Sequence, residues 1–126
     1  MSDPAFTRSS PTEHLDKLLQ AIESNPVIIL VTDAAGSIQY VNAKFTEISG
    51  FSPDELLGQP ARVLMEQTPE EERRMWETLR GGGEWQGTFP SRRKQGDAFL
   101  EEATIFPIKN FGGFITHFVK IGRAHV

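Results

Sequence analysis

The chain has 126 residues, 38% of them hydrophobic, which is enough for one core but hardly for two. Its formal net charge of −4 argues against nucleic-acid binding, because neutralising phosphates requires a basic surface. The absence of cysteine excludes disulfides, thiolate nucleophiles and cysteine-based metal sites.

The first part of the chain divides into a polar stretch and an amphipathic helix. Residues 1–9 are polar and lack periodicity, so we expect them to be disordered. Residues 10–24 open with the capping box of Ser10 and Glu13, and their apolar side chains recur at helical spacing. That apolar stripe consists of Leu15, Leu18, Leu19 and Ile22. The helix is predicted to end before Pro26, because a residue preceding proline is pushed out of the helical region.

A β-hairpin follows and contains the longest apolar run of the chain. We predict strands over 27–32 and 37–41, joined by the turn from Asp33 to Gly36. The apolar run, residues 27–31, is far shorter than the ~20 residues that a membrane-spanning helix needs. No signal-peptide pattern precedes it. The sequence therefore predicts a cytoplasmic protein without a membrane span.

Two short helices with clear start and stop signals are predicted between residues 42 and 58. Asn42 can cap the first, and Gly50 can end it in a left-handed conformation that costs little without a Cβ. Ser52, Pro53 and Glu55 form the start of the second, with proline at its first position and a capping box around it.

A third helix and three strands complete the predicted fold. Thr68 caps a helix over 69–80, whose acidic run 70–72 we interpret as a solvated first turn rather than a metal site. Strands are predicted over 84–93, 98–108 and 114–121, and the basic residues 92–94 are interpreted as a solvated hairpin end. The order predicts an α+β fold with a five-stranded antiparallel sheet and short helices on one face.

The segment Y-V-N-A-K-F-T-E-I-S-G-F-S-P-D-E-L-L-G, residues 40–58, closely resembles a motif of PAS domains, the sensory modules of signalling proteins. Further matches follow in the family's order at 84–87, 92–96 and 101–108. The resemblance covers residues 25–121 and leaves 122–126 as a tail or the start of an output linker. It implies the PAS fold, a sensory input role, and a C-terminal effector domain in a longer protein.

Strand periodicity places a carboxylate where a ligand could sit between sheet and helices. If Trp85 faces the helices, so does Glu101 with its alternate neighbours on the next strand. A carboxylate on an apolar face must find a partner or take up a proton, and a ligand could be that partner. A bulge near Pro90 would instead turn Glu102 inward, and Trp85 could equally be core filler. The residues predicted to contact a ligand are Trp85, Ser91, Glu101, Asn42, Ala61, Arg62, Phe89 and Ala103.

Resemblance to individual PAS branches narrows the choice of cofactor. The bonding cysteine of light-sensing LOV domains falls at Ala61, which excludes covalent photochemistry, and their flavin-contacting asparagines and glutamine fall at Ser91, Glu101 and Gly122. Residues 69–80 hold no histidine, so haem is not expected. The FAD-binding redox branch shares the tryptophan and glycine of 85–87 but departs at Ala61 and Ser91. Three alternatives remain: FAD, an unidentified small or apolar ligand, and an empty interior.

The apolar stripe of the first helix predicts a homodimer in which this helix packs on the partner's sheet. The alternative is that it covers the sheet of its own domain.

Ala124 stands where the family carries an aspartate before its output helix. Either the signal leaves the domain differently here or the last residues are not part of the natural protein. The motifs do not bring together a nucleophile and a general base, so we do not expect an enzyme. A remote alternative is a small enzyme that uses Glu101 as its general acid–base. The leading interpretation is a cytoplasmic sensor that binds a ligand or flavin and signals through dimer packing. A ligand-free interaction module is its rival.

Overall fold

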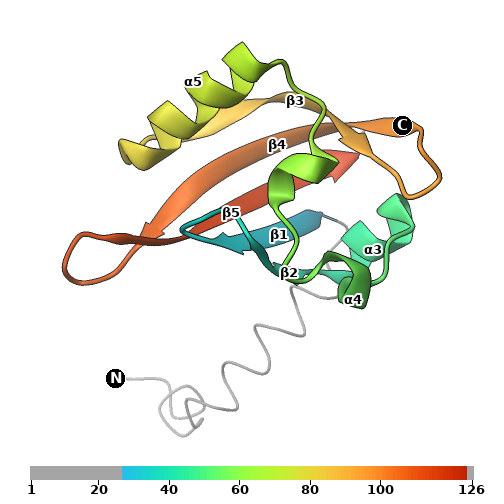
Figure 1. The fold of residues 1–126 in the computed structure, drawn as a ribbon, viewed down its shortest axis with the longest axis horizontal. Helices are drawn as coiled ribbons and strands as arrows, with labels where there is room; N and C mark the ends of the chain where they lie inside the picture. Colours follow the sequence, from blue (N-terminus) through green and yellow to red (C-terminus); the bar gives the residue numbers. More distant parts are fainter. Residues whose placement is uncertain (1–26, 125–126) are drawn as a thin grey trace, which may run out of the picture.

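One antiparallel sheet frames the part of the chain that the computed structural model describes, residues 27–124 (Figure 1). Its strands are β1 (Ile28–Asp33), β2 (Ile38–Val41), β3 (Trp85–Arg92), β4 (Ala98–Lys109) and β5 (Ile115–Ala124). They lie in the order β2-β1-β5-β4-β3, so the last strand, β5, lies in the middle of the sheet and pairs with the first strand, β1. The predicted strands are confirmed, and β5 continues past its predicted end at Ile121 to Ala124.

Short helices cover one face of this sheet, which confirms the predicted α+β arrangement. They are α3 (Ala43–Ser49), α4 (Pro53–Leu56), the 3-10 helix η1 (Ala61–Leu64) and α5 (Pro69–Arg80). Helices α3 and α4 contact β1 and β2, whereas α5 contacts β3 and β4. The 3-10 helix was not predicted; it follows Pro60 and carries Ala61 and Leu64 into the core.

The predicted caps of α3 and α4 are confirmed. The Asn42 side chain accepts a hydrogen bond from the Phe45 backbone N–H (3.1 Å), and Gly50 ends α3 with a φ of 81°. In α4 the Ser52 hydroxyl accepts from the Glu55 N–H, while the Glu55 carboxylate accepts from the Ser52 N–H. These local bonds supply partners for backbone donors that a helix start leaves unpaired.

The basic residues 92–94 were predicted to form a solvated hairpin end; Arg92 and Lys94 are exposed as predicted, whereas the interpretation is wrong for the partly buried Arg93. Arg93 Nη1 donates to the carbonyl of Ile48 (2.9 Å), and its guanidinium lies 5.1 Å from the centre of the Phe99 ring. Lys94 Nζ lies 2.8 Å from Glu55 Oε2. These contacts attach the β3–β4 hairpin to the end of α3 and to α4.

The core lies between the sheet and the helices in two clusters. The first joins β1, β2, α3, α4 and η1 to one end of β4 and contains Ile28, Leu30, Ile38, Val41, Phe45, Leu56, Ala61, Leu64 and Phe99. The second joins α5 to β3, β4 and β5 and contains Met75, Leu79, Phe89, Ala103, Ile105 and Phe118. Along β4 the charged Glu101 stands between Phe99 of the first cluster and Ala103 of the second.

Several predictions concern residues outside the described range. They include the polar stretch 1–9, the helix 10–24 with its stripe of Leu15, Leu18, Leu19 and Ile22, and the last two residues of the tail. These remain predictions.

Candidate functional site

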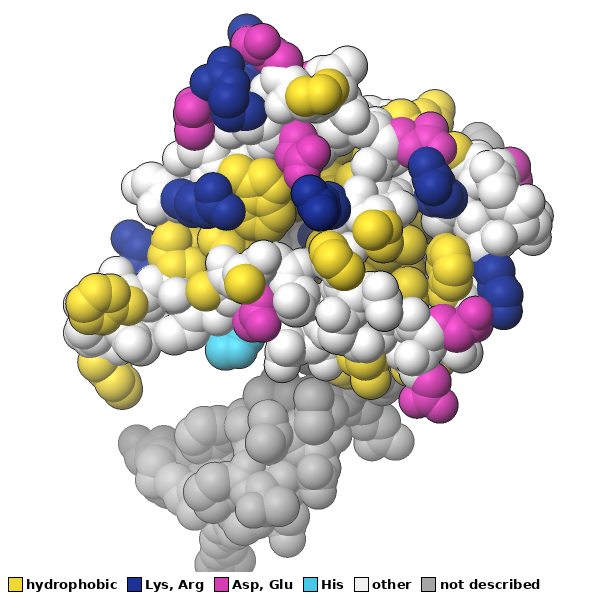
Figure 2. Space-filling view, viewed as in Figure 1, with side chains coloured by type: hydrophobic (Ala, Val, Ile, Leu, Met, Phe, Trp, Pro, Cys, Tyr) yellow, Lys and Arg dark blue, Asp and Glu magenta, His cyan; other side chains and the backbone are white. Residues whose placement is uncertain are grey.

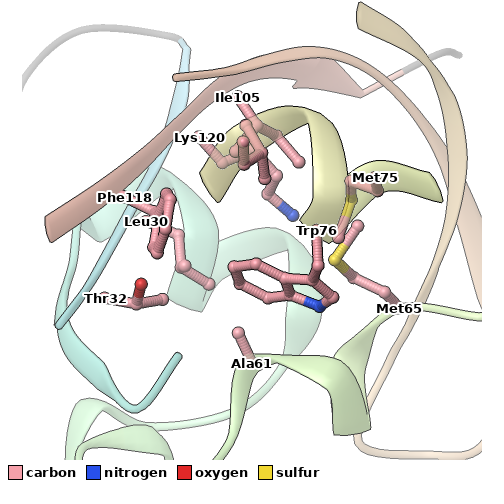
Figure 3. Close-up of a pocket in the computed structure, with 10 residues that line it drawn as sticks. Leu30, Thr32, Ala61, Met65, Met75, Trp76, Ile105, Phe118 and Lys120 are labelled. Carbon is pink, nitrogen blue, oxygen red and sulfur yellow. The ribbon is translucent and has the colours of Figure 1, made fainter. Parts of the chain in front are cut away.

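A small cavity lies between the inner face of the sheet and α5 (Figure 3). Its volume is about 30 Å³. The side chains that line it are Leu30, Thr32, Ala61, Met65, Met75, Trp76, Leu79, Ile105, Phe118 and Lys120. Space of that size holds a water or two, whereas sites for small organic ligands usually span roughly 300–1,000 Å³.

Trp76 limits the size of this cavity. Its indole lies across the space between Ala61 and Lys120 in Figure 3. The ring meets Phe118 edge-on, with 5.1 Å between ring centres, and the Arg80 guanidinium lies 5.3 Å from the indole centre. Helical spacing on α5 turns Met75 and Leu79 into the core and leaves Trp76 half-buried at the edge. Trp76 was predicted as part of this helix, but not as a site residue.

A buried ion pair occupies the inner face of the sheet beside the cavity. Glu101 is 0% exposed and Lys120 is 3% exposed. Lys120 Nζ lies 3.0 Å from Glu101 Oε2, and the Ser91 hydroxyl donates to the same oxygen at 2.8 Å. The ammonium also lies 5.6 Å from the centre of the Phe45 ring. Three neighbouring strands, β3, β4 and β5, thus meet in one charged cluster.

The inward orientation of Glu101 agrees with the predicted strand periodicity. The pairing of β3 with β4 runs without a bulge from Trp85 to Arg92, so the alternative in which Glu102 turns inward is wrong. The need of Glu101 for a partner was also foreseen, but its partner Lys120 was missed. The sequence could have indicated this partner, because the two-residue period of β5 puts Lys120 on the same face as Phe118 and Gly122.

The second carboxylate oxygen of Glu101 lies beside the backbone of β5. Among residues 27–124 this buried Oε1 finds no hydrogen-bond partner. A Cβ added at Gly122 would lie 2.8 Å from Oε1 and 2.7 Å from the carbonyl oxygen of Glu102. Position 122 therefore has no room for a side chain, and the LOV glutamine that was matched to it has no counterpart here.

The predicted ligand-site residues do not gather around the cavity. Of that set, Ala61 lines it, whereas Arg62 is exposed on η1 and lies outside the lining. Asn42 is fully buried, but its Oδ1 accepts from the backbone N–H groups of Ile29 and Phe45 and its Nδ2 donates to the carbonyl of Val27. Its amide therefore holds backbone together.

The remaining predicted residues belong to the core or the ion-pair cluster. Phe89 and Ala103 are buried in the second core cluster, and the half-buried Trp85 packs against it. Ser91 and Glu101 bond to each other and to Lys120. Whether any of them contacts a ligand stays a prediction.

A flavin does not fit this interior. Trp76 and the ion pair fill the space between sheet and helices, leaving about 30 Å³. Of the polar atoms on the two residues matched to flavin contacts, the Ser91 hydroxyl and Glu101 Oε2 bond to each other, and Oε2 also accepts from Lys120. Within the described part, no group of three or more metal-binding side chains comes together, and His117 is exposed.

None of the helices between residues 27 and 124 combines the length and apolar character needed to cross a membrane.

Known proteins resemble this chain over most of its length. The family model of the PAS domain matches residues 25–123. A nitrogen fixation regulatory protein of Klebsiella oxytoca is 33% identical over 113 residues, which are 88% of this chain and 23% of that protein. The hybrid signal transduction histidine kinase L of Dictyostelium discoideum is 35% identical over 92 residues, 73% of this chain and 5% of that protein. The chain thus spans less than a quarter of either relative.

A solved structure supports the same assignment at the level of the fold. The PAS domain of a Colwellia psychrerythraea protein superimposes with a TM-score of 0.75 at 22% identity, covering 89% of this chain and 97% of that one. The order of strands and helices, the capped helices α3 and α4 and the matched residues agree with one another. This chain therefore belongs to the PAS domain family, whose members are sensory modules of signalling proteins rather than catalysts.

Proposed function

We propose that this PAS domain is the input module of a longer cytoplasmic regulator with a C-terminal effector, and that it works without flavin through contacts of its sheet with a second copy. The filled interior carries this proposal. Trp76 and the Glu101–Lys120 pair leave about 30 Å³, far less than an isoalloxazine ring requires. The signal must then pass through protein surfaces. The absence of cysteine from the chain fits a reducing compartment.

The outer face of the sheet offers a surface for such contacts. Leu100, Ile108 and Ile121 are 50%, 41% and 39% exposed there, on the face opposite the helices. A groove of about 660 Å³ crosses β3, β4 and β5 on this side. Val27 lines it and comes three residues after the end of the predicted helix 10–24. We propose that the stripe of this helix, with Leu18 and Ile22 in it, packs in the groove of the partner copy.

Two measurements test the proposal. Visible absorption of the purified chain should show no flavin bands, and denaturation should release none. Sedimentation should give a dimer that the double substitution Leu18→Asp and Ile22→Asp converts to a monomer, because it puts charges where the stripe would bury apolar side chains. The matched control is Leu57→Asp, an exposed leucine directly after α4 on the helix-covered side of the sheet. A yellow protein would contradict the flavin-free interior. An unchanged sedimentation coefficient of the double variant would contradict the proposed dimer interface.

A second candidate function is recognition of a small ligand that carries an oxygen acceptor. Lys120 favours it, because this residue lines the cavity and the bond to Glu101 uses one of the three N–H donors of its ammonium. Such a ligand requires Trp76 to move, which tryptophan fluorescence would report. Titration with benzoate should then raise the melting temperature of the wild-type chain but not of Lys120→Met. Equal effects on both chains, or none, would exclude this candidate.

A further inference from the structure

Two phenylalanines stand in solvent at the tip of the β4–β5 hairpin. Phe111 is 113% exposed and Phe114 is 72% exposed, more than any other large hydrophobic side chain in residues 27–124. Figure 2 shows hydrophobic side chains at the left end of the molecule, over the hairpin that Figure 1 draws there. Aromatic rings gain much from burial, so an exposed pair at one tip indicates a surface for a partner.

The tip that carries these rings is held in one conformation. Asn110 Oδ1 accepts hydrogen bonds from the N–H groups of Gly112 (2.9 Å) and Phe114 (3.1 Å). The Asn110 N–H donates to the Phe114 carbonyl, and the Gly113 N–H donates to the Asn110 carbonyl. Gly113 has a φ of 82°, which suits a residue without Cβ. A preorganised tip loses little conformational entropy when it binds.

A groove of about 430 Å³ opens beside this tip, between the hairpin and the end of α5. Its apolar lining includes Phe114, Ile115 and Phe118. Two cations, Arg80 and Lys109, also line it, and no carboxylate from residues 27–124 does. The groove is therefore apolar and positively charged, although the whole chain carries a net charge of −4.

We propose that this hairpin groove, which is lined by Arg80, Lys109, Phe114, Ile115 and Phe118, docks an acidic protein segment, with Phe111 at the hairpin tip as a further apolar contact. An apolar side chain of the segment packs against Phe114 and Ile115, and a neighbouring carboxylate pairs with Arg80 or Lys109. A lipid surface fits less well, because basic sites for anionic lipids typically gather roughly four to eight cations. The proposal goes beyond the dimer packing above and does not depend on it.

The test uses the complete chain and a fluorescein-labelled acidic peptide of the composition Glu-Leu-Phe-Asp-Glu-Leu, with fluorescence anisotropy as the readout. A matched peptide replaces each acid by its amide. We expect the acidic peptide to bind at least tenfold more tightly than the amide peptide, and addition of sodium chloride to weaken it because the pairing groups are exposed.

Protein variants locate the site. Phe114→Ser and, separately, Lys109→Glu should each weaken binding of the acidic peptide at least tenfold. Leu100→Ser, an exposed leucine on the outer sheet face, should leave it unchanged. Phe111→Ser serves as a second aromatic variant whose melting temperature should match the wild type, because its ring is already in solvent. Equal binding of the two peptides, equal loss in Leu100→Ser, or binding of phosphatidylglycerol vesicles without binding of the acidic peptide would overturn the proposal.

Discussion

Lys120 of β5 reaches Glu101 of β4 in the interior of the domain, with 3.0 Å between Nζ and Oε2 and side chains that are 4% and 0% exposed. The two residues do not stand opposite each other in the sheet; Lys120 is paired in register with Ile105, and Glu101 with Ala124. The long lysine side chain bridges this offset along the inner face. The pair divides the two core clusters and occupies space that a ligand would otherwise have.

Removing one partner of this pair should be far more harmful than removing both. Lys120→Met leaves the Glu101 carboxylate buried without its cation, so we expect a loss of about 3–5 kcal/mol in the free energy of unfolding. The double variant with Glu101→Leu should recover most of that loss, since buried pairs replaced by apolar groups are often neutral. Urea denaturation of the wild type, both single variants and the double variant gives the double-mutant cycle that measures this coupling. Additive effects would contradict the pairing as an energetic unit.

Trp76→Ala should open the cavity. The half-buried indole fills it and contacts Phe118, so its loss should destabilise the domain by about 2–3 kcal/mol, somewhat below the usual range for a fully buried aromatic. Added indole should raise the melting temperature of this variant by filling the vacated space. Trp85→Ala is the control, because Trp85 is also half-buried but lies outside the cavity lining. Rescue of both variants, or of neither, would show that Trp76 does not occupy a ligand-sized space.

Arg93 should contribute more to stability than its neighbour Arg92. Arg93→Met removes the hydrogen bond to the Ile48 carbonyl and the contact with Phe99, and we expect a loss of about 1.5–3 kcal/mol. Arg92 is exposed and lies 3.8 Å from Glu66, so Arg92→Met should change stability by less than about 0.5 kcal/mol. Thermal and urea unfolding of the two variants provide the comparison. Similar losses would mean that Arg93 does not fasten the hairpin to α3.

The Lys94 ammonium hydrogen-bonded to Glu55, with help from the Ser52 N–H, lowers the pKa of Glu55 to about 2. A folded-state pKa below the ordinary value of 4.5 adds stability that is fully present above about pH 4.5 and is lost as the pH falls towards 2. The melting temperature of Glu55→Gln should therefore lie below that of the wild type at pH 6 and converge with it near pH 2. Because Glu55 is exposed, the difference should be small and should shrink in high salt. A difference that grows as the pH falls would contradict the assignment.

The helix starts and the strand faces could be predicted because they depend on nearby residues. Asn42 caps a helix whose third residue is Phe45, and Ser52 and Glu55 close their box within one turn. Glu101 faces inward because side chains alternate along a strand that has no bulge against β3. These features need no knowledge of the rest of the fold.

The tertiary structure decided what fills the interior. Lys120 meets Glu101 because β5 lies beside β4, and Arg93 meets Ile48 although 45 residues separate them in the chain. The cavity volume depends on how Trp76 packs among side chains from β1, β5 and η1, which no local pattern encodes. Residue types and periods therefore determined the family, the elements and the inward carboxylate. The packing of distant segments decided that this carboxylate pairs with a lysine. Which long side chain can reach it depends on which strands lie side by side in the sheet, and not on spacing in the sequence.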